Sequence, residues 1–253
     1  MHFDLDTAGL VALLLVSVRI LAWAIVSPPI ATGMVPHPVK VILSVGIALV
    51  IVPGVKAQAP VAEVAPMAGA LLEQIVIGAG LGFLTRLVFT AIETAGGLLD
   101  LFGGFSLSAA YDPLTTTMTS IFGRFYSLLC TTLIFATNVH LLIFQGFLRT
   151  FSAIPLDGHL TMAHLDKVIA SSVTGLFVSA LQIAGPLIVV LFIADMALGV
   201  LNRIAPQLNA FALSFPLKIG LTLMLVGLGF TLMPGVVVQL ADHANRLIQV
   251  VTT

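Results

Sequence analysis

The chain has little charge. Lys, Arg, Asp and Glu make up only 8% of its 253 residues, and 59% are hydrophobic, whereas a soluble domain carries about 25% charged residues. Because so few charges cannot give a soluble domain a polar surface, we expect an integral membrane protein. The net charge of −1 at pH 7 offers no basic field for nucleic acid. The single cysteine, Cys130, excludes a disulfide within the chain.

Catalytic and nucleotide-binding patterns are also missing. The sequence has no HExxH, GxSxG, GxxxxGK[ST] or helix-opening GxGxxG motif. We therefore expect no catalytic residues, no cofactor and no enzyme activity. His159 and His164 stand beside Asp166, but solvated loop residues explain them better than a metal site does, and we predict none.

What the sequence does have is a series of long, continuous apolar runs. Strands of a membrane barrel would alternate apolar and polar residues, so these runs predict helices. The length allows about six spans of roughly 20 residues. The N-terminus lacks the positive region of a cleavable signal peptide, so we expect the first run to be retained. The predicted class is an all-α polytopic membrane protein, with long kinked spans at residues 10–26, 39–52, 67–94, 120–147, 169–201 and 211–233 and an amphipathic tail helix.

Charged residues lie in or beside several of these runs. Each costs a few kcal/mol at the centre of a bilayer, so such side chains usually face a bundle interior or a cavity. They indicate either a polar pathway or structural ion pairs between helices, and the pattern leaves both open. The residues are Arg19, Glu73, Arg86, Glu93, Asp100, Arg124 and Asp195.

Gly78 and Gly82 form a GxxxG pair within the third run. Small residues on one helix face let two backbones approach closely. We therefore expect these two glycines at a helix–helix contact.

The stretch "LFGGFSLSAAYDP", residues 101–113, interrupts the apolar pattern. It is either an ordinary re-entrant or surface loop, or a gate. Non-helical backbone at membrane depth survives only where protein or a water-filled cavity surrounds it, and an apolar constriction can block ions while staying displaceable. In the gate interpretation aromatic side chains seal and glycines permit movement; the candidate residues are Phe102, Gly103, Gly104, Phe105, Tyr111, Asp112 and Pro113.

Several segments together resemble the FliR family of flagellar type III export-gate proteins. The longest is "ALGVLNRIAPQLNAFALSFPLKIG", residues 197–220. The proline-flanked residues 27–53 are similar to the segment between that family's first two spans. "FSLSAAYDP" and "GRFYSLL" resemble its central region, and "ATNVHLLIFQGFLRTFSAIPL" resembles a further segment. The sequence departs from a fixed pattern at Ala210 and Lys218, where the family varies, so no role is assigned there.

The resemblance implies a single copy of this chain in a helical assembly with FliP and FliQ, around a channel for unfolded flagellar subunits. It implies FlhB and FlhA as cytoplasmic partners, and a place in the bacterial inner membrane within the flagellar basal body. Residues 1–168 would be FliP-like, with a plug loop at about 101–119, and residues 169–253 would form a FliQ-like hairpin and tail. A hairpin loop at the cytoplasmic mouth would contain Asn202, Arg203, Pro206, Gln207 and Asn209.

Three other functions stay open. The injectisome branch of the same superfamily is similar, although "NRIAPQLN" favours the flagellar one. A secondary transporter of a small solute would also use broken helices and midplane charges, but it would need inverted repeats, which we do not find. A polytopic assembly protein without a channel of its own is the third.

Overall fold

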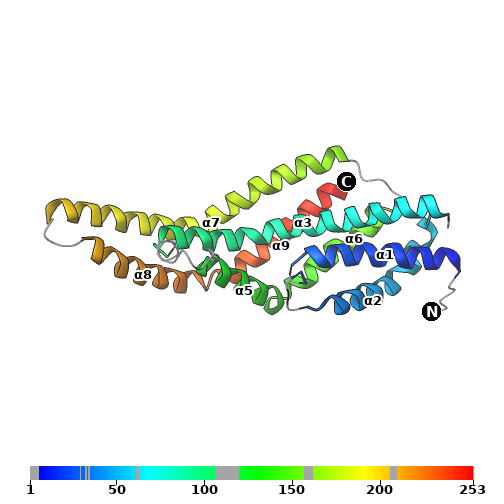
Figure 1. The fold of residues 1–253 in the computed structure, drawn as a ribbon, viewed down its shortest axis with the longest axis horizontal. Coiled ribbons are helices and arrows are strands. Elements are labelled where there is room, and N and C mark those ends of the chain that lie inside the picture. Colours follow the sequence, from blue (N-terminus) through cyan, green and yellow to red (C-terminus); the bar gives the residue numbers. More distant parts are fainter. Residues whose placement is uncertain are drawn as a thin grey trace, which may run out of the picture. The chain divides into compact units, whose positions relative to one another are not determined.

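The structure is a computed structural model, and it describes residues 6–28, 30–31, 33, 35–60, 63–105, 120–156, 162–205 and 210–252. Every regular element in these ranges is a helix (Figure 1). The elements are α1 (Thr7–Val26), α2 (His37–Val55), the 3₁₀ turn η1 (Lys56–Gln58), α3 (Val64–Phe102), α5 (Ile121–Ala136), α6 (Val139–Ala153), α7 (Met162–Ile204), α8 (Ala210–Gly229) and α9 (Met233–Thr252).

The prediction of an all-α, polytopic membrane protein is confirmed. Within the described residues, four helices are long and apolar enough to cross a membrane, and up to six spans result if two bent helix pairs are each counted as one. The α3 helix has 39 residues, so at about 1.5 Å per residue it is roughly 58 Å long, well beyond a hydrocarbon layer of about 30 Å. A helix of that length tilts or projects out of the lipid.

The α1 helix begins at a polar cap. The Asp6 carboxylate accepts a hydrogen bond from the Gly9 N–H at 2.9 Å, as an N-cap aspartate does. It also pairs with the Lys56 ammonium at 2.8 Å, which ties η1 to the start of α1. The bond from Lys56, and then that from Gly9, lower the pKa of Asp6 below its usual value.

The described residues belong to two compact units. The first unit combines Met1–Val88, Asn138–Val173 and Leu240–Thr253. Here α1 runs beside α2 (Figure 1), and its Trp23 stacks on Phe147 of α6 with ring centroids 4.4 Å apart. Leu15 and Trp23 are fully buried, so α1 lies at the centre of this core.

The second unit combines Phe89–Thr137 and Thr174–Gln239. It contains the end of α3, all of α5, most of α7, and α8. An ion pair between Asp195 of α7 and Lys218 of α8, 2.6 Å long, links these two helices. The predicted division at residue 168 into FliP-like and FliQ-like parts stays a prediction.

Two helix boundaries differ from the sequence-based expectation. We expected the third span to end near residue 94, before Gly96 and Gly97, but α3 continues to Phe102. The 120–147 span is interrupted, because Asn138 takes a left-handed conformation with φ of 58° between α5 and α6. Asparagine tolerates that conformation better than most residues do.

The end of the chain differs as well. The last span ends at Gly229 instead of residue 233, and α9 begins at Met233. Pro234 therefore lies in the first turn of α9, where proline's missing N–H costs nothing. The predicted tail helix is thus a 20-residue element.

Candidate functional site

The α3 helix ends in a glycine cap at the start of the predicted plug loop. Gly104 has a φ of +83°, which glycine adopts without steric strain. The Gly103 N–H donates to the Leu99 carbonyl at 2.7 Å, and the Phe105 N–H donates to the Asp100 carbonyl at 3.0 Å. The bond from the Phe105 N–H back to the Asp100 carbonyl, closed around the left-handed Gly104, is the 6→1 bond of a Schellman motif. Gly103 and Gly104 therefore terminate the helix.

The Asp100 side chain fastens this end of α3 to the start of α5. Its carboxylate accepts a hydrogen bond from the Ser120 hydroxyl and one from the Phe122 N–H, which lies 3.1 and 3.2 Å from the two oxygens. The Ser120 hydroxyl in turn accepts from the Gly123 N–H at 2.8 Å. A helix N-terminus favours a carboxylate because its first N–H groups lack partners within the helix. Asp100 is only 5% exposed, and these bonds compensate its burial.

Two more contacts join the same helix ends. A Cβ on Gly96 would lie closer than 3.0 Å to the backbone of Phe122 and Gly123, so the α3 and α5 backbones touch where only glycine fits. The Phe105 ring meets the Phe122 ring edge to face, with centroids 5.0 Å apart and planes at 85°. We call Gly96, Asp100, Phe105, Ser120 and Phe122 the loop base, because they bring together the described residues on both sides of 106–119.

The α8 helix packs beside the glycine cap. A Cβ on Gly103 would lie 2.8 Å from the Thr222 hydroxyl oxygen, and one on Gly104 would lie 3.9 Å from Cδ of Lys218. Gly103 is buried. A larger residue at position 103 would therefore push the cap away from α8.

The structure places four of the seven predicted gate residues. Phe102 is the last residue of α3, and it is partly exposed, as are Gly104 and Phe105. Tyr111, Asp112 and Pro113 lie outside the described residues. From the sequence, Asp100 was identified only as a charge in or beside an apolar run, and Ser120 and Phe122 were not identified. A signal existed: a serine just before an apolar helical run is a typical N-cap.

The predicted hairpin-loop residues are also divided. Asn202 and Arg203 lie in the final turn of α7 and are exposed. Pro206, Gln207 and Asn209 lie outside the described residues. A cation in the last turn of a helix is favoured by the helix dipole, which gives Arg203 a local structural role.

Gly78 and Gly82 face α1. A Cβ on Gly78 would lie closer than 3.0 Å to the Arg19 carbonyl oxygen, and one on Gly82 would lie 2.9 Å from that of Trp23. The backbones of α1 and α3 therefore touch at these two glycines, where α3 has no side chain. This is the close approach that a GxxxG pair permits.

Arg19 is fully buried beside this contact. Its guanidinium donates to Gln74 of α3 at 2.5 Å, and to the carbonyl oxygen of Ile154 at the end of α6 at 3.0 and 3.1 Å. The guanidinium carbon lies 4.5 Å from the centroid of the Phe151 ring. Of the two interpretations of this charge, the structure thus gives Arg19 a helix-joining role.

In the described part of the chain, no group of three His, Cys, Asp or Glu side chains is placed to hold a metal ion. His159 and the side chains of His164 and Asp166 fall outside it.

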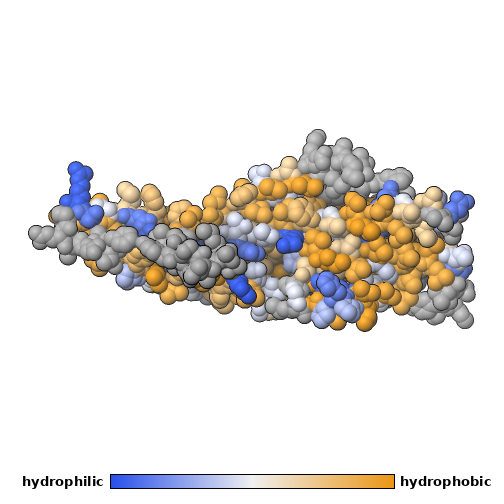
Figure 2. Space-filling view, in the orientation of Figure 1, coloured by the Kyte–Doolittle hydropathy of each residue, from blue (hydrophilic) through white to orange (hydrophobic). Residues whose placement is uncertain are grey.

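Much of the surface in view is hydrophobic (Figure 2). Along α7, apolar side chains that would be buried in a soluble protein stand free in the isolated chain. In the cell, lipid or other membrane helices must cover them. Five that are more than half exposed are Phe177, Val189, Phe192, Ile193 and Met196.

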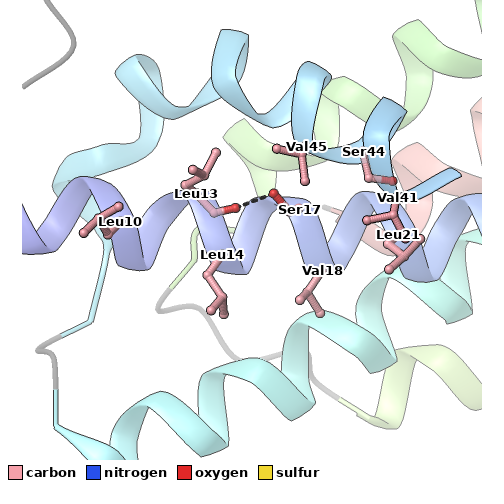
Figure 3. A pocket seen from close by; sticks show the side chains of 9 residues that line it. All are labelled: Leu10, Leu13, Leu14, Ser17, Val18, Leu21, Val41, Ser44 and Val45. Atoms are coloured by element: carbon pink, nitrogen blue, oxygen red, sulfur yellow. Dashed lines mark hydrogen bonds between the residues drawn. The ribbon is translucent and has the colours of Figure 1, made fainter. Parts of the chain in front are cut away.

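An apolar pocket of about 360 Å³ opens between α1 and α2 (Figure 3). The two hydroxyls in its wall are already used, because Ser17 donates to the Leu13 carbonyl at 2.6 Å and Ser44 donates to the Lys40 carbonyl at 2.7 Å. The pocket thus extends the apolar surface. Its wall consists of Leu10, Leu13, Leu14, Ser17, Val18, Leu21, Val41, Ser44 and Val45.

Comparison with known proteins identifies the family. Residues 10–244 match the family described as bacterial export proteins, family 1. The flagellar biosynthetic protein FliR of Pectobacterium carotovorum is 31% identical over 86% of this chain and 83% of its own length. FliR of Escherichia coli K12 is 32% identical over 81% of this chain and 80% of its own.

A relative from a different system is also found. The secretion system apparatus protein SsaT of Salmonella typhimurium is 29% identical over 64% of this chain and 63% of its own length. The similarity therefore extends beyond flagellar proteins. The chain belongs to bacterial export proteins, family 1, the type III export family that includes FliR, and it is a multi-pass membrane protein of that family.

Proposed function

We propose that this chain is a subunit of the flagellar type III export gate. It forms, with FliP and FliQ, a channel through which unfolded flagellar subunits cross the bacterial inner membrane. FlhB and FlhA are its cytoplasmic partners. The family match and the exposed apolar helices support the proposal, because such a surface needs either lipid or partner helices around it.

In this proposal residues 101–113 form the seal of the channel. The observation that carries it is the loop base, where Asp100 fixes the two flanking helices so that residues 106–119 start and end at one place. Phe102, Phe105 and Tyr111 supply the apolar seal. Gly103 and Gly104, which close the helix cap, lie at the start of the proposed seal.

Deleting residues 103–110 tests the seal. We expect the complex to assemble and the membrane to become leaky to ions and small solutes, as measured with a potential-sensitive dye in cells. An assembled complex in a tight membrane would remove the seal from the proposal.

The partners are tested by a gentle-detergent pull-down of the tagged chain from its native membrane, followed by mass spectrometry. We expect FliP- and FliQ-like proteins in excess over this chain. Recovery of the chain alone would contradict the gate assignment and return a small-solute transporter to consideration.

The end of α7 is proposed to lie at the cytoplasmic mouth. Arg203→Glu places an acid at a helix C-terminus and removes an exposed cation. We expect weaker export from an assembled complex. Normal motility in this variant would contradict a role for Arg203.

An injectisome subunit is the second candidate, and the similarity to SsaT is the observation that favours it. Deleting the gene and scoring flagellar filaments separates the two. Loss of filaments supports the flagellar assignment, whereas intact filaments with lost secretion of other proteins support the injectisome.

A further inference from the structure

Residues 106–119 are bounded by two helix ends that touch. On the α3 side, the Schellman cap stops the helix at Gly103 and directs the chain away through Gly104. On the α5 side, Ser120 caps the helix by accepting from the Gly123 N–H. The α3 end is thus closed by its own backbone bonds and the α5 end by the Ser120 side chain, while the Asp100 carboxylate and close packing join one end to the other.

Of the contacts named above between the described helix ends, those of the Asp100 carboxylate are hydrogen bonds. It receives the Ser120 hydroxyl and the Phe122 N–H together, and both donors belong to the first turn of α5. The other two contacts, Gly96 against the Phe122 backbone and Phe105 against the Phe122 ring, are van der Waals contacts. Apolar contacts tolerate sliding, whereas hydrogen bonds to a buried carboxylate fix both distance and direction.

We infer that Asp100 is a positioning residue for the seal. It acts through Ser120 and the N–H of Phe122, and it sets how firmly the described flanks of 106–119 are held together. This inference rests on the proposed gate function. On this inference, the ion tightness of the seal depends on one buried carboxylate and not on the flexibility of Gly103 and Gly104.

Asp100→Asn is the matched substitution, because asparagine has nearly the same shape. Asparagine keeps one acceptor oxygen but turns an amide donor toward a site that already supplies an O–H and an N–H. Losing one partner from a buried hydrogen-bonded group shifts an equilibrium roughly tenfold. We therefore expect roughly tenfold more ion leak through the resting export complex of cells.

Two further variants separate positioning from general damage. Ser120→Ala removes the hydroxyl but keeps the Phe122 N–H, so we expect a smaller leak. In the double variant we expect a leak smaller than the two single effects combined, because Ser120 acts through the same side chain. Glu93→Gln, on an exposed acid of the same helix, is the charge control and stays tight.

The experiment measures ion leak in cells, the yield of the assembled complex, and its denaturation midpoint in detergent. Leak from Asp100→Asn with a normal yield of the assembled complex supports positioning, and the lost hydrogen bond should also lower the denaturation midpoint. Tight membranes with both single variants assembled overturn it, as do additive leaks in the double variant. If Asp100→Asn fails to assemble, Ser120→Ala decides: a leak supports the inference and a tight membrane overturns it.

The 103–110 deletion, run in parallel, separates the two claims. If the deletion makes the membrane leak while Asp100→Asn leaves it tight, only the positioning role of Asp100 is disproved. A tight membrane with both complexes assembled defeats the proposed seal as well.

Discussion

The guanidinium of Arg19 donates two hydrogen bonds to the carbonyl oxygen of Ile154, at 3.0 and 3.1 Å. Ile154 is the C-cap of α6, where the last carbonyls of a helix lack partners within the helix. Arg19, a charged residue within the apolar α1, thus caps the C-terminal end of α6.

Arg19→Lys tests this contact. An ammonium is a point donor and cannot bond Gln74 and Ile154 in the fork geometry of arginine. We expect a loss of about 1.5–3 kcal/mol in the free energy of unfolding, the range for hydrogen bonds to charged groups. Denaturation of the purified complex in detergent measures it. The exposed Arg149, changed to lysine, is the control, and an equal effect of both changes would contradict the role of Arg19.

Gly78→Ala tests the contact between α1 and α3. The added methyl group would meet the Arg19 carbonyl closer than 3.0 Å, so the helices must move apart. Overpacking of this kind costs about 1–3 kcal/mol. Gly80→Ala, two residues along α3 with nothing within 4 Å, is the control and should be neutral or stabilising. Equal denaturation midpoints for the two variants would disprove the close approach.

Gly104→Ala tests the helix cap. A side chain at a φ of +83° is strained, and the left-handed region costs roughly 1–2 kcal/mol for most residues. Because asparagine tolerates this region better, Gly104→Asn should lose less stability than Gly104→Ala. Gly220→Ala on α8, in open space, controls for the added methyl group. If alanine and asparagine at position 104 behave alike in denaturation, the left-handed cap is incorrect.

Asp6 gives a pH-dependent prediction. Its pKa is lowered by Lys56 and Gly9, so its carboxylate stabilises the folded state at pH values above the usual 3.8. That stabilisation is lost as the pH falls through the lowered pKa. Asp6→Asn should therefore lower the denaturation midpoint at pH 7, and the difference from the natural chain should vanish in strong acid. A difference that persists there would assign the effect to hydrogen bonding and not to charge.

The helices of this fold follow from the sequence, but their ends do not. Continuous apolar runs predict helices because the bilayer leaves no other solution for them. The third apolar run predicted a helix that ends near residue 94, and Gly96 and Gly97 follow that position. In the structure Gly96 is needed where it stands, because α5 crosses against it and no larger residue fits. Packing between helices thus overrides local propensity.

The candidate site was only partly predictable for a related reason. The aromatic and glycine pattern near residue 101 pointed to a special segment, but the partners of Asp100 lie 20 and 22 residues further along the chain. A single sequence carries no signal for such pairing. The same holds for Arg19, whose contacts at Gln74 and Ile154 are 55 and 135 residues away.

The first unit is built from segments at both ends of the chain, and this has a consequence for the synthesis of the protein. Its core includes residues from Leu240 onward, and Asn245 of α9 packs on Gly146 of α6 and donates to the Leu142 carbonyl at 3.2 Å. During synthesis the core that contains α1, α2 and the start of α3 therefore cannot be completed until α9 has been made. At the speed of the ribosome this delay is on the order of ten seconds. In that interval the chain depends on the insertion machinery and its surrounding lipid to keep an unfinished core from pairing wrongly.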